Sequence, residues 1–153
     1  MPSEMPHPTW HLPDPHSQPE FYADVPLKRL IAWLIDTILI AVLSALIVPF
    51  TFFTGLFFFP FLMLVIGFAY RVVMLANGSA TLGMRLTAIE FRDAQGTKFD
   101  LQTAFMHTLG YSFSIAIVPV QMVSIVLMLT TERAQGLSDH MLGTVALNRR
   151  AGY

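Results

Sequence analysis

The feature that most constrains this chain is a long apolar stretch that holds one charged side chain. From Leu30 to Tyr70 the only charged residue is Asp36, in the sequence IAWLIDTILI. A helix needs about 20 apolar residues to span the hydrocarbon core of a bilayer. Charged residues make up 12% of the 153-residue chain, compared with about 25% in soluble domains. The sequence therefore predicts an all-α integral membrane protein.

Three apolar segments predict a small helical bundle of three to four transmembrane segments. They cover residues 30–50, 56–74 and 104–131, and Pro119 interrupts the third. Because proline breaks the interior of a helix, the third segment is either one kinked span or two shorter helices that turn near Pro119. We favour the pair of helices, since an even number of crossings returns the tail to the side of the central loop.

The polar link between the second and third segments predicts a short β-hairpin outside the bilayer. RLTAIEFRD alternates between apolar and polar residues, AQG is typical of a turn, and TKFDL would return as the second strand. Near the end of the chain, GTVALN predicts a further strand at Thr144–Leu147. This strand could pair with the hairpin if both lie on the same side of the membrane.

Lys and Arg residues near the span ends predict the orientation, because they are enriched on the cytoplasmic side. Lys28 and Arg29 precede the first span, and the link to the second span has no basic residue. Further basic residues lie at the end of the second span and after it: Arg71, Arg85, Arg92 and Lys98. We therefore expect the N-terminus and the central hairpin to be cytoplasmic.

The first 26 residues hold seven of the ten prolines and lack both the basic region and the apolar core of a signal peptide. They predict a flexible tail ahead of a membrane domain at residues 27–148, with a short tail at 149–153. His7, His11 and His16 are scattered through this leader, so we expect no metal site. The chain has no cysteine, which excludes disulfides and thiolate chemistry.

A carboxylate inside a membrane helix is unfavourable unless it finds partners. Arg29 lies seven residues before Asp36, on the same helical face. Asp139, in QGLSDHMLGT, could join them if the tail folds back beneath the bundle. The sequence therefore predicts one functional polar cluster of Arg29, Asp36 and Asp139.

Three segments in this order resemble the RDD family of bacterial membrane proteins: PLKRLIAWLIDTILI, NGSATLGMRLTAIEFRDAQG and AQGLSDHMLGTVAL. The family is named for one arginine and two aspartates, which correspond here to Arg29, Asp36 and Asp139. The resemblance covers about residues 25–148 and implies a multi-pass protein of the bacterial inner membrane. Some members are linked to sodium–proton exchange. Secondary site candidates are Thr81, Gly83, Arg85, His107 and His140.

Two functions are compatible with these features. In the first, Asp36 and Asp139 carry H⁺ or Na⁺ across the membrane, which three or four spans could do only within an oligomer. In the second, the cluster is a structural clasp in a scaffold, assembly factor or accessory subunit. We expect the lipid bilayer and either a second copy or another membrane protein as partners, and no cofactor. The net charge of −1 gives no attraction to nucleic acid.

Enzyme activity is not expected. GSATLG lacks the GK[ST] ending of a phosphate-binding loop. Ser138, Asp139 and His140 are adjacent in sequence, which does not arrange them as a catalytic triad, because a triad depends on spatial arrangement.

Overall fold

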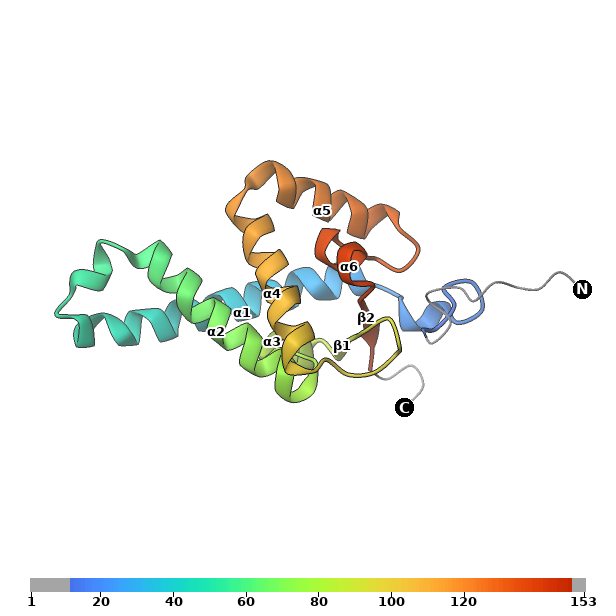
Figure 1. Ribbon diagram of the computed structural model, residues 1–153, viewed down its shortest axis with the longest axis horizontal. Coiled ribbons are helices and arrows are strands. Elements are labelled where there is room, and N and C mark those ends of the chain that lie inside the picture. The colour runs from blue at the N-terminus through green and yellow to red at the C-terminus, as the bar shows by residue number, and fades with distance from the viewer. Residues whose placement is uncertain (1–11, 150–153) are drawn as a thin grey trace, which may run out of the picture.

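The computed structural model describes residues 12–149, and the chain is mostly helical (Figure 1). The long helices are α1 (Val25–Ile47), α2 (Phe59–Gly78), α4 (Leu101–Ala116) and α5 (Val118–Thr130). The shorter elements are η1 (Pro19–Phe21), η2 (Val48–Thr51), η3 (Thr54–Leu56), α3 (Leu82–Leu86) and α6 (Leu137–Leu142), with the strands β1 (Ile89–Arg92) and β2 (Val145–Asn148).

Helices α1 and α2 form a long hairpin whose far end extends away from the rest of the chain (Figure 1). The connection, formed by η2 and η3, exposes large aromatic side chains: Phe50, Phe52 and Phe57 are 84–91% exposed. By length and composition, Pro19–Thr51 and Phe59–Gly78 could each cross a membrane. An apolar exterior of this kind is typical of a chain that is solvated by lipid rather than water.

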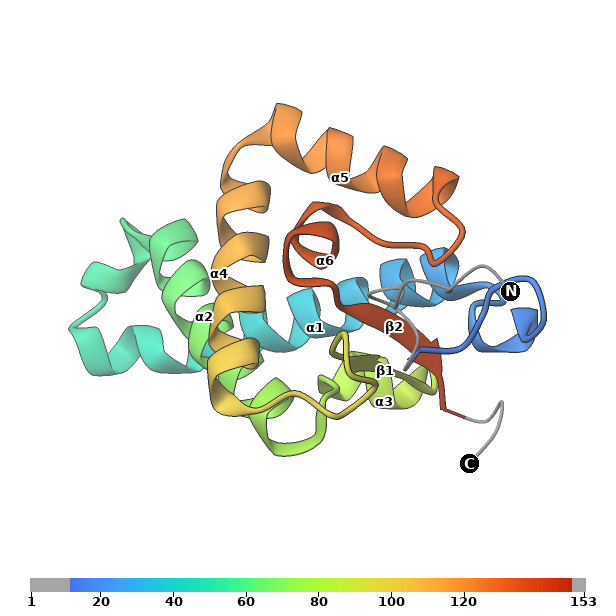
Figure 2. The ribbon, with the colours of Figure 1, turned by 45° about the vertical axis from the view of Figure 1, so that its right-hand side comes forward.

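The third apolar segment is broken, as the position of Pro119 predicts. The chain bends by 117° between α4 and α5, at Ile117, and Pro119 is the second residue of α5. Proline has no N–H to continue the hydrogen bonding of α4, and its ring would clash with the preceding turn. Figure 2 shows α4 and α5 meeting at a corner, with α6 inside the angle. The bent pair counts as a third span if it crosses the membrane as one unit.

The predicted hairpin is wrong in its second strand. β1 pairs antiparallel with β2, from Ile89 opposite Asn148 to Arg92 opposite Val145. The segment TKFDL forms no strand, because Asp100 accepts a hydrogen bond from Thr103 N (2.8 Å) and begins α4. The predicted tail strand therefore supplies the partner of β1, which brings the central loop and the tail together.

The described part of the leader is packed rather than flexible, so the expected tail at residues 1–26 is wrong for residues 12–26. Leu12, Phe21 and Tyr22 are at most 8% exposed and form one apolar cluster with Val145 and Leu147 of β2. Pro19 and Pro26 lie at the starts of η1 and α1, where a missing N–H costs little, and the apolar residues of this segment pack against β2. His7, His11 and the rest of residues 1–11 lie outside the described residues, as do 150–153 of the expected C-terminal tail.

The main core lies where the first half of α1 meets α3, the sheet and the start of α4. Its buried side chains are Val25 from α1, Leu75 from the end of α2, Met84 from α3, Ile89 and Ala146 from the strands, and Ala104 from α4. Buried polar side chains lie on the same elements: Asp36 on α1, Thr81 at the start of α3, His107 on α4 and Asp139 on α6.

Candidate functional site

Asp36 lies at the midpoint of α1 and is 3% exposed. Its Oδ1 accepts hydrogen bonds from the Tyr70 hydroxyl (2.7 Å) and the Gly83 backbone N–H (2.9 Å). Its Oδ2 accepts one from the Thr81 hydroxyl (2.6 Å). Three neutral donors from α2 and the start of α3 therefore satisfy this carboxylate, and no ion pair joins it to another residue of the described chain.

Thr81 and Gly83 belong to the turn that begins α3, and each is suited to its place. The Thr81 hydroxyl also accepts from Met84 N (3.2 Å), so the same side chain caps α3 and holds Asp36. A Cβ at Gly83 would lie 2.2 Å from the Ala32 carbonyl oxygen. Only glycine therefore allows α3 to approach α1 closely enough for its amide to reach Asp36.

Arg29 and Asp139 form a separate ion pair near the start of α1. The Arg29 Nη1 lies 2.6 Å from Asp139 Oδ2 and 3.2 Å from the Ala134 carbonyl oxygen. The Arg29 side chain is 14% exposed and Asp139 is fully buried. The Arg29 guanidinium also lies over the Phe91 ring, 5.3 Å from its centroid. This pair connects the first helix to α6 and the sheet.

Asp139 is surrounded by donors. Besides Arg29, its carboxylate contacts His107 Nε2 (2.8 Å), the Thr144 hydroxyl (2.7 Å) and Gly136 N (3.0 Å). Burial alone would raise the pKa of the Asp139 carboxyl, but the Arg29 guanidinium and the His107 ring outweigh this effect and hold the pKa well below its usual range. Asp139 is therefore an ionised anchor for three segments of the chain.

The prediction of a single polar cluster is wrong. Arg29 contacts Asp139 but makes no hydrogen bond to Asp36, although both residues lie on α1. The separation of seven residues is about 10 Å along a helix axis, which exceeds the length of a direct bond. The two acids instead occupy two centres, which we call the Asp36 centre (Asp36, Tyr70, Thr81, Gly83) and the Asp139 centre (Arg29, His107, Asp139, Thr144).

The secondary candidates divide between the two centres. Thr81 and Gly83 bind Asp36, and His107 binds Asp139. Arg85 is exposed and lies outside both centres, and His140 Nδ1 pairs with the Gly136 carbonyl oxygen (2.8 Å) within its own helix turn.

Sequence reasoning missed Tyr70, Thr144 and Gly136. Gly136 and Thr144 lie in glycine-containing turns at the two ends of α6, and Tyr70 carries a hydroxyl in the interior of the apolar helix α2. Each offers a neutral donor to a buried carboxylate. Within residues 12–149 no group of three or more His, Cys, Asp or Glu residues could hold a metal ion. His16 pairs with Glu132 at 3.1 Å, and both side chains are exposed.

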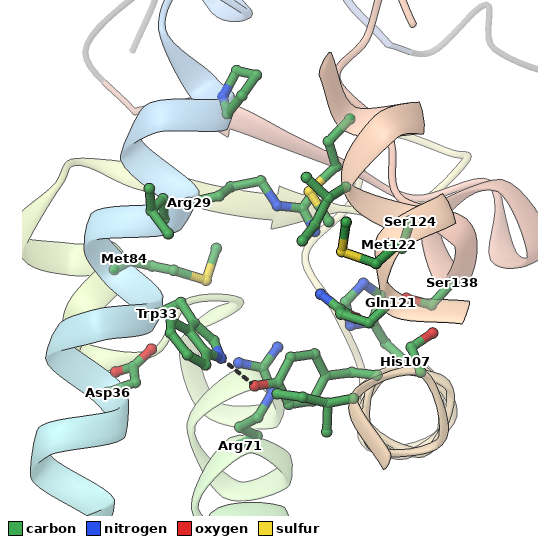
Figure 3. Close-up of a pocket in the computed structure, with 18 of the residues that line it drawn as sticks. Arg29, Trp33, Asp36, Arg71, Met84, His107, Gln121, Met122, Ser124 and Ser138 are labelled. Carbon is green, nitrogen blue, oxygen red and sulfur yellow. Dashed lines mark hydrogen bonds between the residues drawn. The ribbon is translucent and has the colours of Figure 1, made fainter. Parts of the chain in front are cut away.

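A cavity of about 520 Å³ lies between α1, α4 and α5, beside both centres. Figure 3 shows Arg29, Trp33 and Arg71 on one side of it, with Gln121 and Met122 facing them from α5. The Trp33 indole N–H donates to the Tyr111 hydroxyl at 2.7 Å, drawn as the dashed line. Much of the remaining wall is formed by aliphatic and methionine side chains: Leu30, Met84, Val118, Ile125, Met128 and Leu129.

Comparison with known proteins gives one match. A family model described as the RDD family matches residues 24–143, which include α1 through α6 and every residue of the two centres except Thr144. No curated protein and no solved structure matches this chain.

Proposed function

The chain belongs to the RDD family, and from this premise we propose that it is a non-transporting membrane scaffold or accessory subunit whose two acid centres are structural clasps. In this role the Asp36 centre joins α1 to α2 and α3, and the Asp139 centre joins α1 to α4, α6 and the sheet. The apolar α1–α2 hairpin would anchor the protein in a bilayer.

One observation carries this proposal: both oxygens of each carboxylate already accept hydrogen bonds from the chain itself. Asp36 accepts three hydrogen bonds and Asp139 contacts four donor groups. A cation carrier needs carboxylate oxygens that can exchange their partners for the ion. Breaking a buried ion pair such as Arg29–Asp139 by removing one member costs about 3–5 kcal/mol, and leaving a buried donor of Asp36 unsatisfied costs about 1–3 kcal/mol. Releasing these donors in each transport cycle would therefore be unfavourable.

We further propose that the protein is a multi-pass component of the bacterial inner membrane with a cytoplasmic N-terminus. Lys28 and Arg29 lie at the end of the hairpin that carries the sheet, and the far end has no charged residue between Thr37 and Tyr70. Excess Lys and Arg marks the cytoplasmic side. The partners would be the lipid and a second copy or another membrane protein, and no enzymatic activity is proposed.

Transport of H⁺ or Na⁺ is the second candidate, and one observation favours it: Asp36 lines the cavity as well as binding its three donors. A conformational change that freed one oxygen of Asp36 would expose it to this space. The two proposals differ in whether the negative charge of Asp36 is needed, or only its ability to accept hydrogen bonds.

The experiment compares wild type, Asp36→Asn and Asp36→Ala in vesicles with a trapped pH indicator and an imposed Na⁺ gradient. We expect wild type to exchange no faster than Asp36→Asn or empty vesicles. Exchange by wild type that Asp36→Asn abolishes would overturn the clasp proposal in favour of transport.

Unfolding of the same variants in detergent tests the clasp directly. An asparagine retains one oxygen acceptor, so we expect Asp36→Asn to lose about 1 kcal/mol, whereas Asp36→Ala should lose at least about 2 kcal/mol because the donors are left without an acceptor. Ser44→Ala is the matched control, because the Ser44 hydroxyl is buried on the same helix without a hydrogen-bond partner. Equal stability of Asp36→Ala and Ser44→Ala would contradict the clasp.

A further inference from the structure

Arg71 is a buried cation that neither acid centre uses. It lies on α2, is 8% exposed and lines the cavity. Its Nε is buried without a hydrogen-bond partner, and no hydrogen bond or ion pair joins its guanidinium to another residue in the described range 12–149. Burying a charge without a hydrogen bond or ion pair costs free energy. Neither acid centre supplies such a partner to Arg71, so the two clasps do not explain why this charge is buried.

Among residues 12–149, the contact that the Arg71 guanidinium makes is with an aromatic face, and the Asp36 carboxylate adds only a longer-range attraction. Its guanidinium carbon lies 3.9 Å from the centroid of the Tyr111 ring. Trp33 fixes this ring through the hydrogen bond to the Tyr111 hydroxyl. A cation–π contact stabilises a charge through the ring face but leaves the N–H donors in the guanidinium plane free. Figure 3 shows Arg71 at the base of the cavity, beside this bonded pair.

Free guanidinium donors at one end of an apolar cavity select an anion with an apolar body. The planar fork of arginine binds carboxylate and phosphate oxygens in pairs. The opposite wall, from α5, offers mainly apolar contact through Met122, Ile125 and Met128, with Gln121 and Ser124 as its polar residues. A volume of about 520 Å³ is within the usual range for a small-molecule site.

The other charged residues at the cavity do not compete for this role. Arg29 is already paired with Asp139 at 2.6 Å. Asp36 is the one carboxylate among the residues that line the cavity, and both of its oxygens already accept hydrogen bonds. Arg71 is therefore the cation left for a ligand.

We propose that this cavity binds an anionic amphiphile, with its carboxylate or phosphate head on Arg71 and a single apolar chain along α5. The bilayer is the natural source of such a molecule, either as a free fatty acid or as one chain of an anionic phospholipid. This site is independent of the clasp proposal, because it uses none of the hydrogen bonds that define the two acid centres.

Trp33 lines the cavity and provides the readout. The chain has two tryptophans, so Trp10→Phe leaves Trp33 as the sole tryptophan, which can be excited selectively. The purified full chain is titrated with dibromostearic acid, whose bromines quench tryptophan at short range, and in parallel with its uncharged methyl ester. We expect saturable quenching by the acid, reversed by unbrominated stearate, and at least about tenfold weaker binding of the ester.

Arg71→Gln should weaken binding of the acid by about tenfold, to the level of the ester. Arg85→Gln makes the same substitution at an exposed arginine outside the cavity and should leave binding unchanged. Equal quenching by acid and ester, or equal binding by wild type and Arg71→Gln, would overturn the proposal. The comparison of acid with ester needs no variant at Arg71, so it tests the proposal even if Arg71→Gln does not fold.

Two further measurements distinguish the source of the anion. Nanodiscs with brominated phosphatidylglycerol should quench Trp33 more than nanodiscs with brominated phosphatidylcholine if a membrane phospholipid is the ligand; quenching by the free acid alone identifies a fatty acid. Inorganic phosphate should not compete with the brominated acid. Competition by phosphate as strong as that by stearate would overturn the amphiphile proposal, because the apolar chain would then contribute nothing.

Discussion

Arg29 in α1 and Asp139 in α6 are 110 residues apart in sequence, and their side chains meet at 2.6 Å. This pair holds the first membrane helix against the C-terminal part of the chain. Because Asp139 is fully buried and Arg29 nearly so, removing either partner leaves the other as a charge without compensation.

A double-mutant cycle measures this coupling. Arg29→Met and Asp139→Asn should each lower the free energy of unfolding by about 3 kcal/mol. The double variant should lose less than the sum, with a coupling of about 1–3 kcal/mol. Unfolding in mixed detergent, followed by circular dichroism, provides the measurement.

Asp24→Asn is the control for this cycle, because Asp24 is exposed and its side chain does not cap α1. Its stability should match that of wild type. Additive losses from Arg29→Met and Asp139→Asn would show that the two side chains do not stabilise the fold through their contact.

The sequence predicts the contact between Arg29 and Asp139 for a physical reason: a buried charge needs a charge of opposite sign, and residue types reveal charge. The break near Pro119 is predictable in the same way, since proline excludes a continuous helix whatever its neighbours are. The apolar spans follow from composition and length alone.

The partners of Asp36 are not predictable in this way. Tyr70 and Thr81 bind it through neutral hydroxyls, and Gly83 binds it through a backbone amide that every residue except proline also has. The pairing of β1 with β2 depends on contacts between distant segments, so local alternation predicts the strands but assigns the wrong neighbour to β1. The packing of Phe21 and Tyr22 depends on the same sheet.

Gly83→Ala tests the close approach of α3 to α1. The added Cβ would lie 2.2 Å from the Ala32 carbonyl oxygen, and backbone on both sides leaves no easy relaxation. We expect a loss of at least about 2 kcal/mol in the free energy of unfolding.

The matched control is Gly67→Ala, in the interior of α2, where the new Cβ would be 3.4 Å from Ile40 Cδ1, an ordinary contact. Alanine there should change the stability by no more than about 1 kcal/mol and favours the helix. If Gly83→Ala were as stable as Gly67→Ala, the close packing of α3 on α1 would be contradicted.

Asn148 joins the end of β2 to the N-terminal segment. Its amide donates to the Glu20 and Ala23 carbonyl oxygens, both at 2.8 Å, and its oxygen accepts from Lys28 Nζ at 2.7 Å. Asn148→Asp keeps the acceptor for Lys28 but turns a carboxylate oxygen towards two carbonyls. We expect a loss of about 2 kcal/mol and faster chymotrypsin cleavage at Phe21, which is buried in the wild type.

The control for this substitution is Asn77→Asp, because Asn77 is on α2 and bonds only to the Val73 carbonyl oxygen within its own helix. Its cleavage rate at Phe21 should equal that of wild type. An unchanged cleavage rate in Asn148→Asp would mean that the apolar cluster alone holds the N-terminal segment on the sheet.

The lowered pKa of Asp139 predicts how stability changes with pH. Because the folded-state pKa is below the value of about 3.9 in an unfolded chain, the ionised carboxylate stabilises the fold above that pH. This contribution decreases as the pH falls below about 4, since the unfolded chain then binds a proton that the folded chain excludes. The free energy of unfolding of wild type exceeds that of Asp139→Asn, and this difference should shrink by about 1 kcal/mol between pH 6 and pH 3.

The measurement is the free energy of unfolding of both proteins across this range. Asp24→Asn should follow the wild-type curve, and a gap between wild type and Asp139→Asn that stays constant or widens with acid would contradict an ionised Asp139 in the folded state.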